Sequence, residues 1–502
     1  MQIAAQLADN TFHASQSNVP YVDAVKNLAD RATARLLVPG HGGGGDVAPA
    51  LTSVIGAAPV HLDVTPLLWG IDRGPDDGLE AARMLAAQAW GARRTWFLTN
   101  GASQANRMAL VALAGMSRGD RSVVAQRSAH SSFVDGLVVT GLTPEFVLPT
   151  IDTELGIAHG VHPSDVAAAL ARRPYARGVY VISPSYFGAV SDVRAIADVA
   201  HTHGIPLIVD NAWGAHFGFH PDLPANPLSL GADLLVSSTH KMGGSLHQSA
   251  MLHLAPGPFA EELEQLVDRA HRLTQSTSWS SILTASLDIA RRELATKPER
   301  ISSAMAGARR LIAALESAGI PVASTHFSAL RGVVANDPLN VTIDVRGTGI
   351  DGAEVRERLA LDYGILTEMA TASTVVALIP PGLDVDEHAF VDALTRIARG
   401  HNPVPRNRIP PLPAVGEMLL TPRDAYFASA ETVAAEDAIG RISAESLAAY
   451  PPGIPNVMPG EIIARETVQF LRAVSTSPGG YVRGALNPAI THLRVVASGL
   501  AT

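Results

Sequence analysis

Short apolar runs alternate with amphipathic segments between about residue 80 and residue 255. The apolar runs, each typical of a buried strand, are RTWFLT, SVVAQ, EFVLPT, RGVYVIS, IPLIVD and ADLLVSS. The segments between them, such as HPSDVAAALARR and DVRAIADVAHTHG, repeat apolar residues with a helical period. Strands that alternate with helices predict a mainly parallel sheet covered by helices on both faces. The pattern therefore predicts an α/β fold, in which sites lie beyond the carboxyl ends of the strands.

The pattern changes after about residue 300. The segments NVTIDVRG, DGAEVRERLALDYG and STVVALIPPG predict a smaller α/β domain. A proline-rich segment, HNPVPRNRIPPLPAVG, separates it from a C-terminal segment that carries YPPGIPNVMPGE. We therefore expect an N-terminal arm over residues 1–50, a large domain over 51–295, a smaller α/β domain over 296–400, and a linker with a C-terminal domain over 401–502.

Composition narrows the class of protein. The chain has 502 residues, 47% of them hydrophobic and 17% charged, which is enough for a large core. With 38 lysines and arginines against 47 aspartates and glutamates, its net charge of −9 disfavours nucleic-acid and anionic-membrane partners. It has no cysteine, which excludes disulfides and thiol chemistry and fits a reducing compartment. Because we find no secretory signal and no bilayer-spanning apolar run, we expect a cytoplasmic protein.

Lys241 stands in the segment SSTHKMGGSLHQ, directly after the apolar run ADLLVS. Lysine is among the residues least often fully buried, so its place at the end of a core strand needs a reason. One interpretation is a solvated loop. The other is a lysine held in a pocket because its amine does covalent chemistry.

Two further strand ends carry polar groups. The segment Asn100-Gly101-Ala102-Ser103 lies between a strand and a helix, where backbone N–H groups and a serine hydroxyl bind anions. A glycine turn followed by a serine helix start explains the same residues, and by itself that reading is the stronger one. Asp210 ends the run PLIVD and either caps the next element or holds a proton on a ring nitrogen of a ligand.

Three histidines, His130, His216 and His220, are candidate ligand-binding residues. His130, in RSAHSSF, is either an ordinary hydrogen-bonded polar residue or a side chain that stacks on a flat ligand. His216 and His220 have helical spacing, but the glycine between them and the proline that follows disfavour a helix. We therefore expect no metal site there.

Lys241, the anion-binding loop and Asp210 together match the needs of pyridoxal 5′-phosphate (PLP). That cofactor needs a Schiff-base lysine, a cradle for its phosphate and a carboxylate for its pyridinium nitrogen. Each feature is weak alone. Their combination within one α/β domain favours a PLP site over three unrelated structural roles.

At the level of motifs, the chain resembles the Orn/Lys/Arg decarboxylases. The matching segments are PGHGGG, LTNGASQANR, RSAHSSFVDGL, SPSYFGAVSD, VDNAWGAHFGFHPDLP, SSTHKMGGSLHQSAML and YPPGIPNVMPGE. The resemblance covers nearly the whole chain and is to the short form that lacks an N-terminal wing domain. It implies the aspartate aminotransferase-like (fold type I) architecture and PLP-dependent decarboxylation of arginine, lysine or ornithine to the amine and CO2.

The resemblance also implies a role for each site residue. Lys241 would bind the cofactor covalently, Asp210 would pair with its ring nitrogen, and His130 would stack on its ring. His240 would face the reacting carbon, and Glu461 would hold the distal cation of the substrate. Residues implied to contact the cofactor, with Trp213 also walling the substrate site, are Gly101, Ala102, Ser103, Ala212, Trp213 and Ser238.

Several positions depart from the family pattern near the expected substrate mouth. Gly42 and Ser131 stand where family members usually have lysine, and Asn211 stands where glutamate is frequent. Pro66 and Trp69 change a further segment, TPLLWGID. The cofactor residues are intact, so these departures leave open which amino acid is decarboxylated and whether a modified or neutral one is used.

Two rival functions remain at this level. One is a PLP-dependent aminotransferase or lyase, for which Arg346 in DVRGTG is the candidate partner of the substrate α-carboxylate. The other is a non-catalytic relative, which the presence of Lys241, Asp210 and His130 disfavours. In either enzyme the fold type implies a homodimer or a dimer-based oligomer with shared active sites, and the N-terminal arm is expected to cross to the partner.

Overall fold

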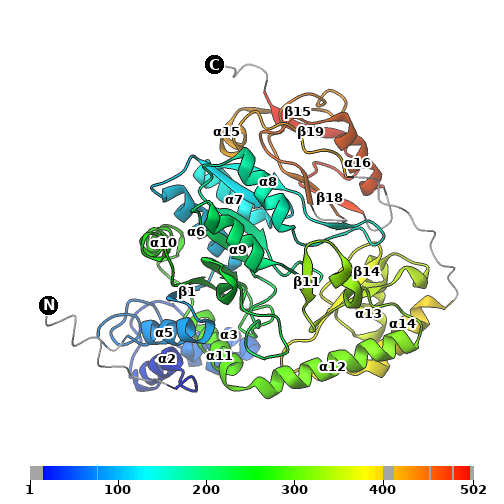
Figure 1. The fold of residues 1–502 in the computed structure, drawn as a ribbon. Coiled ribbons are helices and arrows are strands. Elements are labelled where there is room, and N and C mark those ends of the chain that lie inside the picture. The colour runs from blue at the N-terminus through cyan, green and yellow to red at the C-terminus, as the bar shows by residue number, and fades with distance from the viewer. Residues whose placement is uncertain (1–14, 76, 400–411, 451–453, 477–479, 498–502) are drawn as a thin grey trace.

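A seven-stranded sheet forms the centre of the structure, a computed structural model that describes residues 15–75, 77–399, 412–450, 454–476 and 480–497 (Figure 1). From one edge to the other its strands are β1 (Arg94–Leu98), β10 (Ala250–Leu254), β9 (Leu234–Ser237), β8 (Leu207–Asp210), β6 (Val179–Ile182), β2 (Ser122–Gln126) and β3 (Thr143–Val147). Strands β3, β2, β6, β8 and β9 pair in parallel, and β10 is antiparallel to both of its neighbours. The α/β prediction is confirmed, although β10 was not among the predicted strands.

Because the strands pair in parallel, the carboxyl ends that carry polar residues all lie at the same end of the sheet. In the register, Asp210 at the end of β8 lies opposite Ile182 of β6 and Val236 of β9. The segment that contains Lys241 leaves the sheet after Ser237, the last residue of β9. The sheet thus positions Asp210 and Lys241 from adjacent strands, as expected for a parallel α/β fold.

Helices cover both faces because successive strand residues point to opposite sides. In β8, Ile208 faces the helices α6 (Gly101–Gly115), α7 (Ser131–Thr140) and α10 (Ala260–Thr274). Leu207 and Val209 face the other way. That second face packs against α2 (Pro20–Arg31), α5 (Gly78–Trp90), α8 (Pro163–Arg172), α9 (Val193–Thr202) and α11 (Ser281–Thr296).

A smaller domain lies beside the large sheet at the end of the long helix α12 (Pro298–Ser317), as Figure 1 shows. Its antiparallel sheet has the order β12 (Asn340–Asp344), β14 (Thr374–Leu378) and β13 (Met369–Ala370). Helices α13 (Gly352–Tyr363) and α14 (Glu387–Ala398) pack on it, and their apolar residues join the cluster on the second face of the large sheet. The predicted domain boundaries stay predictions.

The C-terminal segment forms two small antiparallel sheets above α7 and α8 (Figure 1). They contain β15 (Ala430–Ala434) with β19 (His492–Val496), and β17 (Ile454–Val457), β16 (Leu447–Tyr450) and β18 (Tyr481–Arg483). Helices α15 (Pro422–Phe427) and α16 (Arg465–Ser475) accompany them. Most of the proline-rich linker and part of YPPGIP lie outside the described residues.

Short elements complete the fold near the chain start and between the domains. They are α3 (Pro49–Ile55), α4 (Ala57–Leu62), the pair β4 (Ile151–Asp152) and β5 (Ile157–Ala158), and the pair β7 (Ala189–Ser191) and β11 (Val333–Asn336). Within the described ranges, no helix is both long enough and apolar enough to cross a bilayer.

A buried ion pair joins the C-terminal segment to the large domain. Arg127 follows β2 and donates to both carboxylate oxygens of Glu461, at 2.5 and 2.8 Å. Each side chain is only 1% exposed. The Nε of Arg127 also donates to the Pro455 carbonyl, and the Met458 N–H donates to Glu461. Both charges are therefore satisfied without water.

Glu461→Gln should destabilise the protein by about 3–5 kcal/mol, because it leaves the guanidinium of Arg127 buried without a counter-ion. Urea unfolding of the purified variant measures this loss. Asp392→Asn is the matched control, since Asp392 pairs with Arg396 on the exposed surface of α14 and is expected to cost less than about 1 kcal/mol. Equal losses in the two variants would contradict the stabilising role of the buried pair.

Candidate active site

Two loops that carry predicted site residues are linked by a hydrogen bond at the carboxyl-terminal end of the sheet. The Lys241 N–H donates to the Ser238 carbonyl at 2.9 Å, which closes a turn directly after β9. Seven residues after Lys241, the carbonyl of Gln248 accepts the Gly101 N–H at 2.7 Å. Gly101 has a φ of +69°, where glycine avoids the strain of a side chain, and it begins α6. The lysine loop and the anion-binding loop therefore hold one another in place.

The amine of Lys241 is held against an aromatic ring rather than in solvent. Its Nζ lies 3.4 Å from the ring centroid of Trp213. Burial lowers the pKa of this amine to about 8, and the negative charges of Asp210 and Glu368 oppose the shift. A larger fraction of the amine is therefore unprotonated near neutral pH than in a solvated lysine, which favours a nucleophilic role.

Asp210 is a buried carboxylate whose position is fixed by three donors. Its Oδ2 lies 2.9 Å from the Nδ2 of Asn106 and 2.9 Å from the hydroxyl of Tyr180. Its Oδ1 accepts the Ala212 N–H at 3.1 Å. Because a carboxylate oxygen accepts more than one hydrogen bond, Oδ1 retains the capacity to bind a ligand N–H.

His130 is connected to Asp210 through two polar side chains. Asn106 Nδ2 also donates to Ser132 Oγ at 3.0 Å, and that oxygen lies 2.8 Å from His130 Nδ1. The Ser132 N–H donates to the same Nδ1, so this nitrogen is an acceptor and the neutral ring carries its proton on Nε2. Burial lowers the pKa of His130; Asp210 opposes this effect, and Lys241 and Arg483 add to it. The ring is therefore neutral at physiological pH.

The start of α6 retains free backbone donors. The side chain of Asn100 does not cap the helix, and the first N–H groups of a helix, here those of Ala102 and Ser103, have no intrahelical acceptor. Near Lys241, the Oγ1 of Thr239 is buried and has no hydrogen-bond partner among the described residues. A buried amine, a carboxylate with spare acceptor capacity and an uncapped helix start are the three groups that PLP requires, so the residues fit this cofactor.

His240 has a defined tautomer. Its Nδ1 lies 2.8 Å from the Ser249 carbonyl, which only accepts, so Nδ1 carries the proton and Nε2 is free to take one up. Burial lowers the pKa of His240; the Ser249 carbonyl opposes this, while Lys241 and His247 lower it further. His240 is therefore a neutral acceptor at physiological pH.

Glu461 does not occupy the place that the sequence analysis gave it. Its carboxylate is fully buried and already shared with Arg127, so it has no free charge for a substrate cation. The family motif identified the residue, but its charge partner comes from a segment more than three hundred residues away and has no sequence signature. Within one chain, the structure therefore disagrees with Glu461 as the substrate-binding carboxylate.

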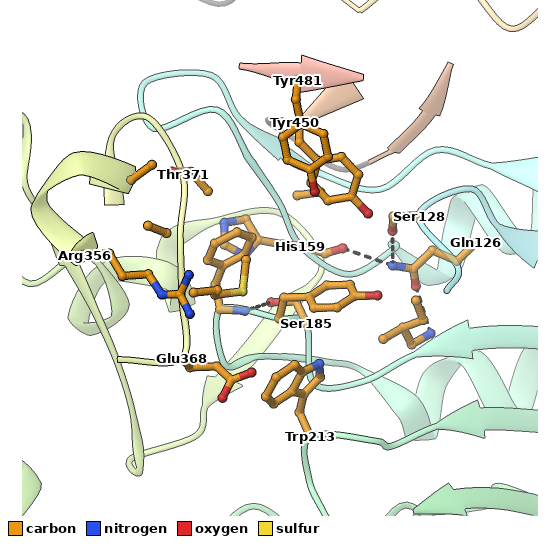
Figure 2. A pocket seen from close by; sticks show the side chains of 17 residues that line it. Gln126, Ser128, His159, Ser185, Trp213, Arg356, Glu368, Thr371, Tyr450 and Tyr481 are labelled. Carbon is orange, nitrogen blue, oxygen red and sulfur yellow. Dashed lines mark hydrogen bonds between the residues drawn. The ribbon is translucent and has the colours of Figure 1, made fainter. Parts of the chain in front are cut away.

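A cavity of about 480 Å³ reaches Trp213 from the side of the smaller domain. Figure 2 shows Arg356 and Glu368 at one end, Gln126 and Ser128 at the other, and Tyr450 and Tyr481 above. The lining residues that sequence reasoning missed include Gln126, Tyr186, Arg356, Glu368, Tyr450 and Tyr481. They come from three separate parts of the chain, and no sequence motif singled out Glu368.

Three of the family departures, Asn211, Ser131 and Gly42, have separate structural explanations. Asn211 is buried and donates to the Ser183 carbonyl at 2.6 Å, which is a structural role. Ser131 accepts a hydrogen bond from Arg483 at 3.1 Å, so a residue of β18 brings positive charge to the start of α7. Gly42 has a φ of +59°, which favours glycine. Trp69 is 77% exposed and Pro66 is partly buried, neither of them in the cavity.

His216 and His220 have different partners. His216 Nε2 lies 3.1 Å from Asp337 Oδ1, and His220 Nε2 lies 2.9 Å from Ser302 Oγ. Their segment is a series of turns rather than a helix.

The rate at which added PLP becomes covalently attached to the cofactor-free protein should rise roughly tenfold between about pH 7 and about pH 9 and then level off. The reason is that the amine must lose its proton to react, and the pKa of Lys241 is about 8. Stopped-flow absorbance measures the rate. A rate that keeps rising tenfold for each pH unit through about pH 10 would show an ordinary lysine pKa instead.

Tyr180→Phe should weaken PLP binding roughly tenfold, because it removes one hydrogen bond to the Asp210 carboxylate. Equilibrium dialysis against PLP measures the dissociation constant. Tyr175→Phe is the matched control, since Tyr175 is 73% exposed on the surface. Unchanged affinity in Tyr180→Phe would mean that Asp210 does not depend on this hydroxyl.

Comparison with known proteins identifies the family of the chain. The sequence model of the Orn/Lys/Arg decarboxylase major domain matches residues 19–313, and that of the family's C-terminal domain matches residues 413–479. The chain is 33% identical to an arginine decarboxylase of Bacillus subtilis over 91% of this chain and 94% of the relative. It is 32% identical to an arginine decarboxylase of Halalkalibacterium halodurans over 96% of this chain and 98% of the relative.

The fold has a solved counterpart. The structure of the Francisella novicida lysine decarboxylase matches 99% of this chain and 83% of its own length, with a TM-score of 0.80 at 17% identity. This likeness concerns the fold. Together, the two matched domain models and the relatives show that the chain belongs to the Orn/Lys/Arg decarboxylase family of PLP-dependent carboxy-lyases, which act on basic amino acids.

Proposed function

We propose that this enzyme decarboxylates arginine, giving agmatine and CO2. The observation that carries the proposal is the similarity, at 32–33% identity over nearly the full chain, to proteins named arginine decarboxylases. The cavity lined by Trp213, the ring against which Lys241 lies, supports it, because its walls combine aromatic rings with a carboxylate. Aromatic faces and a carboxylate both favour a guanidinium over a neutral side chain.

We further propose how the chain holds PLP. Lys241 binds it covalently, Asp210 keeps a proton on its ring nitrogen, and His130 lies against its ring. The N–H groups of Ala102 and Ser103, with the hydroxyls of Ser103 and Ser238, bind its phosphate, while Gly101, Ala212 and Trp213 enclose it. When bound, PLP accepts the electron pair that the substrate α-carbon gains as CO2 leaves.

We infer that Lys241, rather than His240, returns a proton to the substrate carbon. With a pKa of about 8, the free amine is mostly protonated at neutral pH, whereas burial lowers the pKa of His240 and keeps its Nε2 unprotonated. His240 Nε2 would then accept and return protons to the amine, its orientation fixed by the Ser249 carbonyl. Of Lys241 and His240, the proposed proton donor is thus Lys241, the group with the higher pKa.

An aminotransferase that uses Arg346 is disfavoured by the contacts of that residue. Its guanidinium is held by Asp344 at 2.6 Å and lies 3.7 Å from Glu154. Two carboxylates therefore compete with any substrate α-carboxylate. The residue belongs to an ion-pair network at the end of β12 rather than to the cavity beside Trp213.

We also propose a homodimer in the cytoplasm. The described part of the N-terminal arm and the segment that follows it present a set of large apolar side chains to solvent, which is unusual for a monomer. They are Leu36, Val38, Val47, Val54, Ile55 and Trp69. Burial against a second copy would remove them from water, and the absence of cysteine fits a reducing compartment.

The purified enzyme with PLP should convert arginine to a product lighter by one CO2. Mass spectrometry of mixtures with arginine, lysine, ornithine and neutral amino acids identifies the substrate by comparing initial rates. Lys241→Ala is the control and should lose turnover, because it lacks the amine that binds the cofactor. Faster decarboxylation of lysine or ornithine, or formation of a keto acid, would refute the arginine proposal.

A further inference from the structure

A substrate with a distal cation requires a carboxylate in its cavity, because a buried cation without a partner is costly. The two carboxylates that the sequence motifs suggest, Asp210 and Glu461, already have partners within the protein. Asp210 accepts hydrogen bonds from Asn106, Tyr180 and Ala212, and Glu461 is paired with Arg127. The carboxylate that receives the substrate must therefore be a different one.

Glu368 is the remaining candidate. Among the described residues that line the cavity it is the only carboxylate. Its side chain is exposed, and within the described parts of the chain it has no hydrogen-bond or ion-pair partner. Figure 2 shows it at the cavity end formed by the smaller domain, next to Trp213. It is thus a free acceptor that faces the space a substrate would enter.

A backbone hydrogen bond fixes the main chain at Glu368, and so fixes the position from which its side chain extends. Its N–H donates to the Val376 carbonyl at 3.0 Å, in register with the pairing of β13 and β14 that begins at Met369. The charge of Glu368 raises the pKa of the Lys241 amine, against the larger effect of burial. Glu368 therefore lies within the electrostatic range of the reacting amine while belonging to a separate domain.

The rest of the cavity wall offers little other charge. Burial lowers the pKa of His159 to about 4 and raises that of Tyr186, so both side chains are neutral at physiological pH. Arg356 is the only guanidinium among the described lining residues, and its Nε donates to the Thr367 carbonyl at 3.2 Å. Arg356 and Glu368 thus present opposite charges from neighbouring positions of one wall (Figure 2).

We propose that Glu368 is the specificity-determining residue of this site, binding the distal cation of the substrate through its free carboxylate. Arg356, beside it, opposes the cation and so limits how strongly it binds. The inference rests on the proposed function for the identity of the cation, a guanidinium. It assigns to the smaller domain the role that the sequence motif had suggested for Glu461.

Two probes test the charge directly without turnover. n-Propylguanidinium carries the cation and n-propylurea is its neutral isostere, and neither has an amine that exchanges with Lys241 at the cofactor. Titration calorimetry on the PLP-loaded enzyme gives both dissociation constants. In Glu368→Gln the cation should bind roughly tenfold to a hundredfold more weakly, because a charge-assisted hydrogen bond is lost, while n-propylurea binding stays within about threefold.

Two further variants sharpen the result. Arg356→Gln should strengthen binding of n-propylguanidinium, because it removes a like charge from the same wall. Glu357→Gln, an exposed residue of α13 outside the cavity, is the matched control and should bind both probes as the wild type does. In steady state, Glu368→Gln should raise KM for arginine with a smaller change in kcat, as expected for lost substrate binding.

The inference is overturned if Glu368→Gln binds n-propylguanidinium as tightly as the wild type, or if it loses both probes equally. The second result would indicate a general disturbance of the cavity rather than a lost charge. Failure of the proposed function is a separate outcome. If the wild-type enzyme forms no agmatine from arginine, the probe measurements still decide the role of Glu368, because they need no turnover.

Discussion

Burying the amine of Lys241 is the constraint around which the site is organised. Desolvation disfavours its charged form, and the ring of Trp213, the carboxylate of Asp210 and the carboxylate of Glu368 each offset part of that cost. The balance leaves an amine whose pKa is about 8, which can act as a nucleophile and later as an acid. A fully solvated lysine would hold its proton too strongly for the first role.

The neutral state of the two site histidines follows from the same burial. His130 is a hydrogen-bond acceptor at Nδ1, and His240 is a donor at Nδ1, because their partners are a backbone N–H and a backbone carbonyl. Each tautomer is thus set by the main chain rather than by a titrating neighbour. Since the network from His130 to Asp210 passes through Ser132 and Asn106, one arrangement orients both of the residues that we propose contact the cofactor ring.

The site depends on three parts of the chain that the sheet alone does not bring together. The large domain supplies Lys241, Asp210 and Trp213, the smaller domain supplies Glu368, and the C-terminal segment supplies Tyr450. The buried pair of Arg127 and Glu461 holds the C-terminal segment against β2. Glu461, which the motif suggests for substrate binding, thus joins two parts of the chain through an ion pair. In our proposal the substrate cation is bound instead by Glu368, which belongs to no recognised motif.

The α/β class, the cofactor and the family were predictable from the order of residues alone, because they depend on local features: apolar strands, and polar residues at their ends. Asp210 and Lys241 were predictable because the carboxyl ends of parallel strands all lie at one end of the sheet, where ligands bind. Only the tertiary structure decided what each charge does. Glu461, Arg346 and Glu368 look alike as charged residues in a sequence, but their roles depend on what each contacts: Arg127 for Glu461, Asp344 and Glu154 for Arg346, and the cavity for Glu368. Within the described residues Glu461 and Arg346 are paired and Glu368 is not, and a pairing such as Arg127 with Glu461, between segments far apart in the chain, leaves no periodic signal.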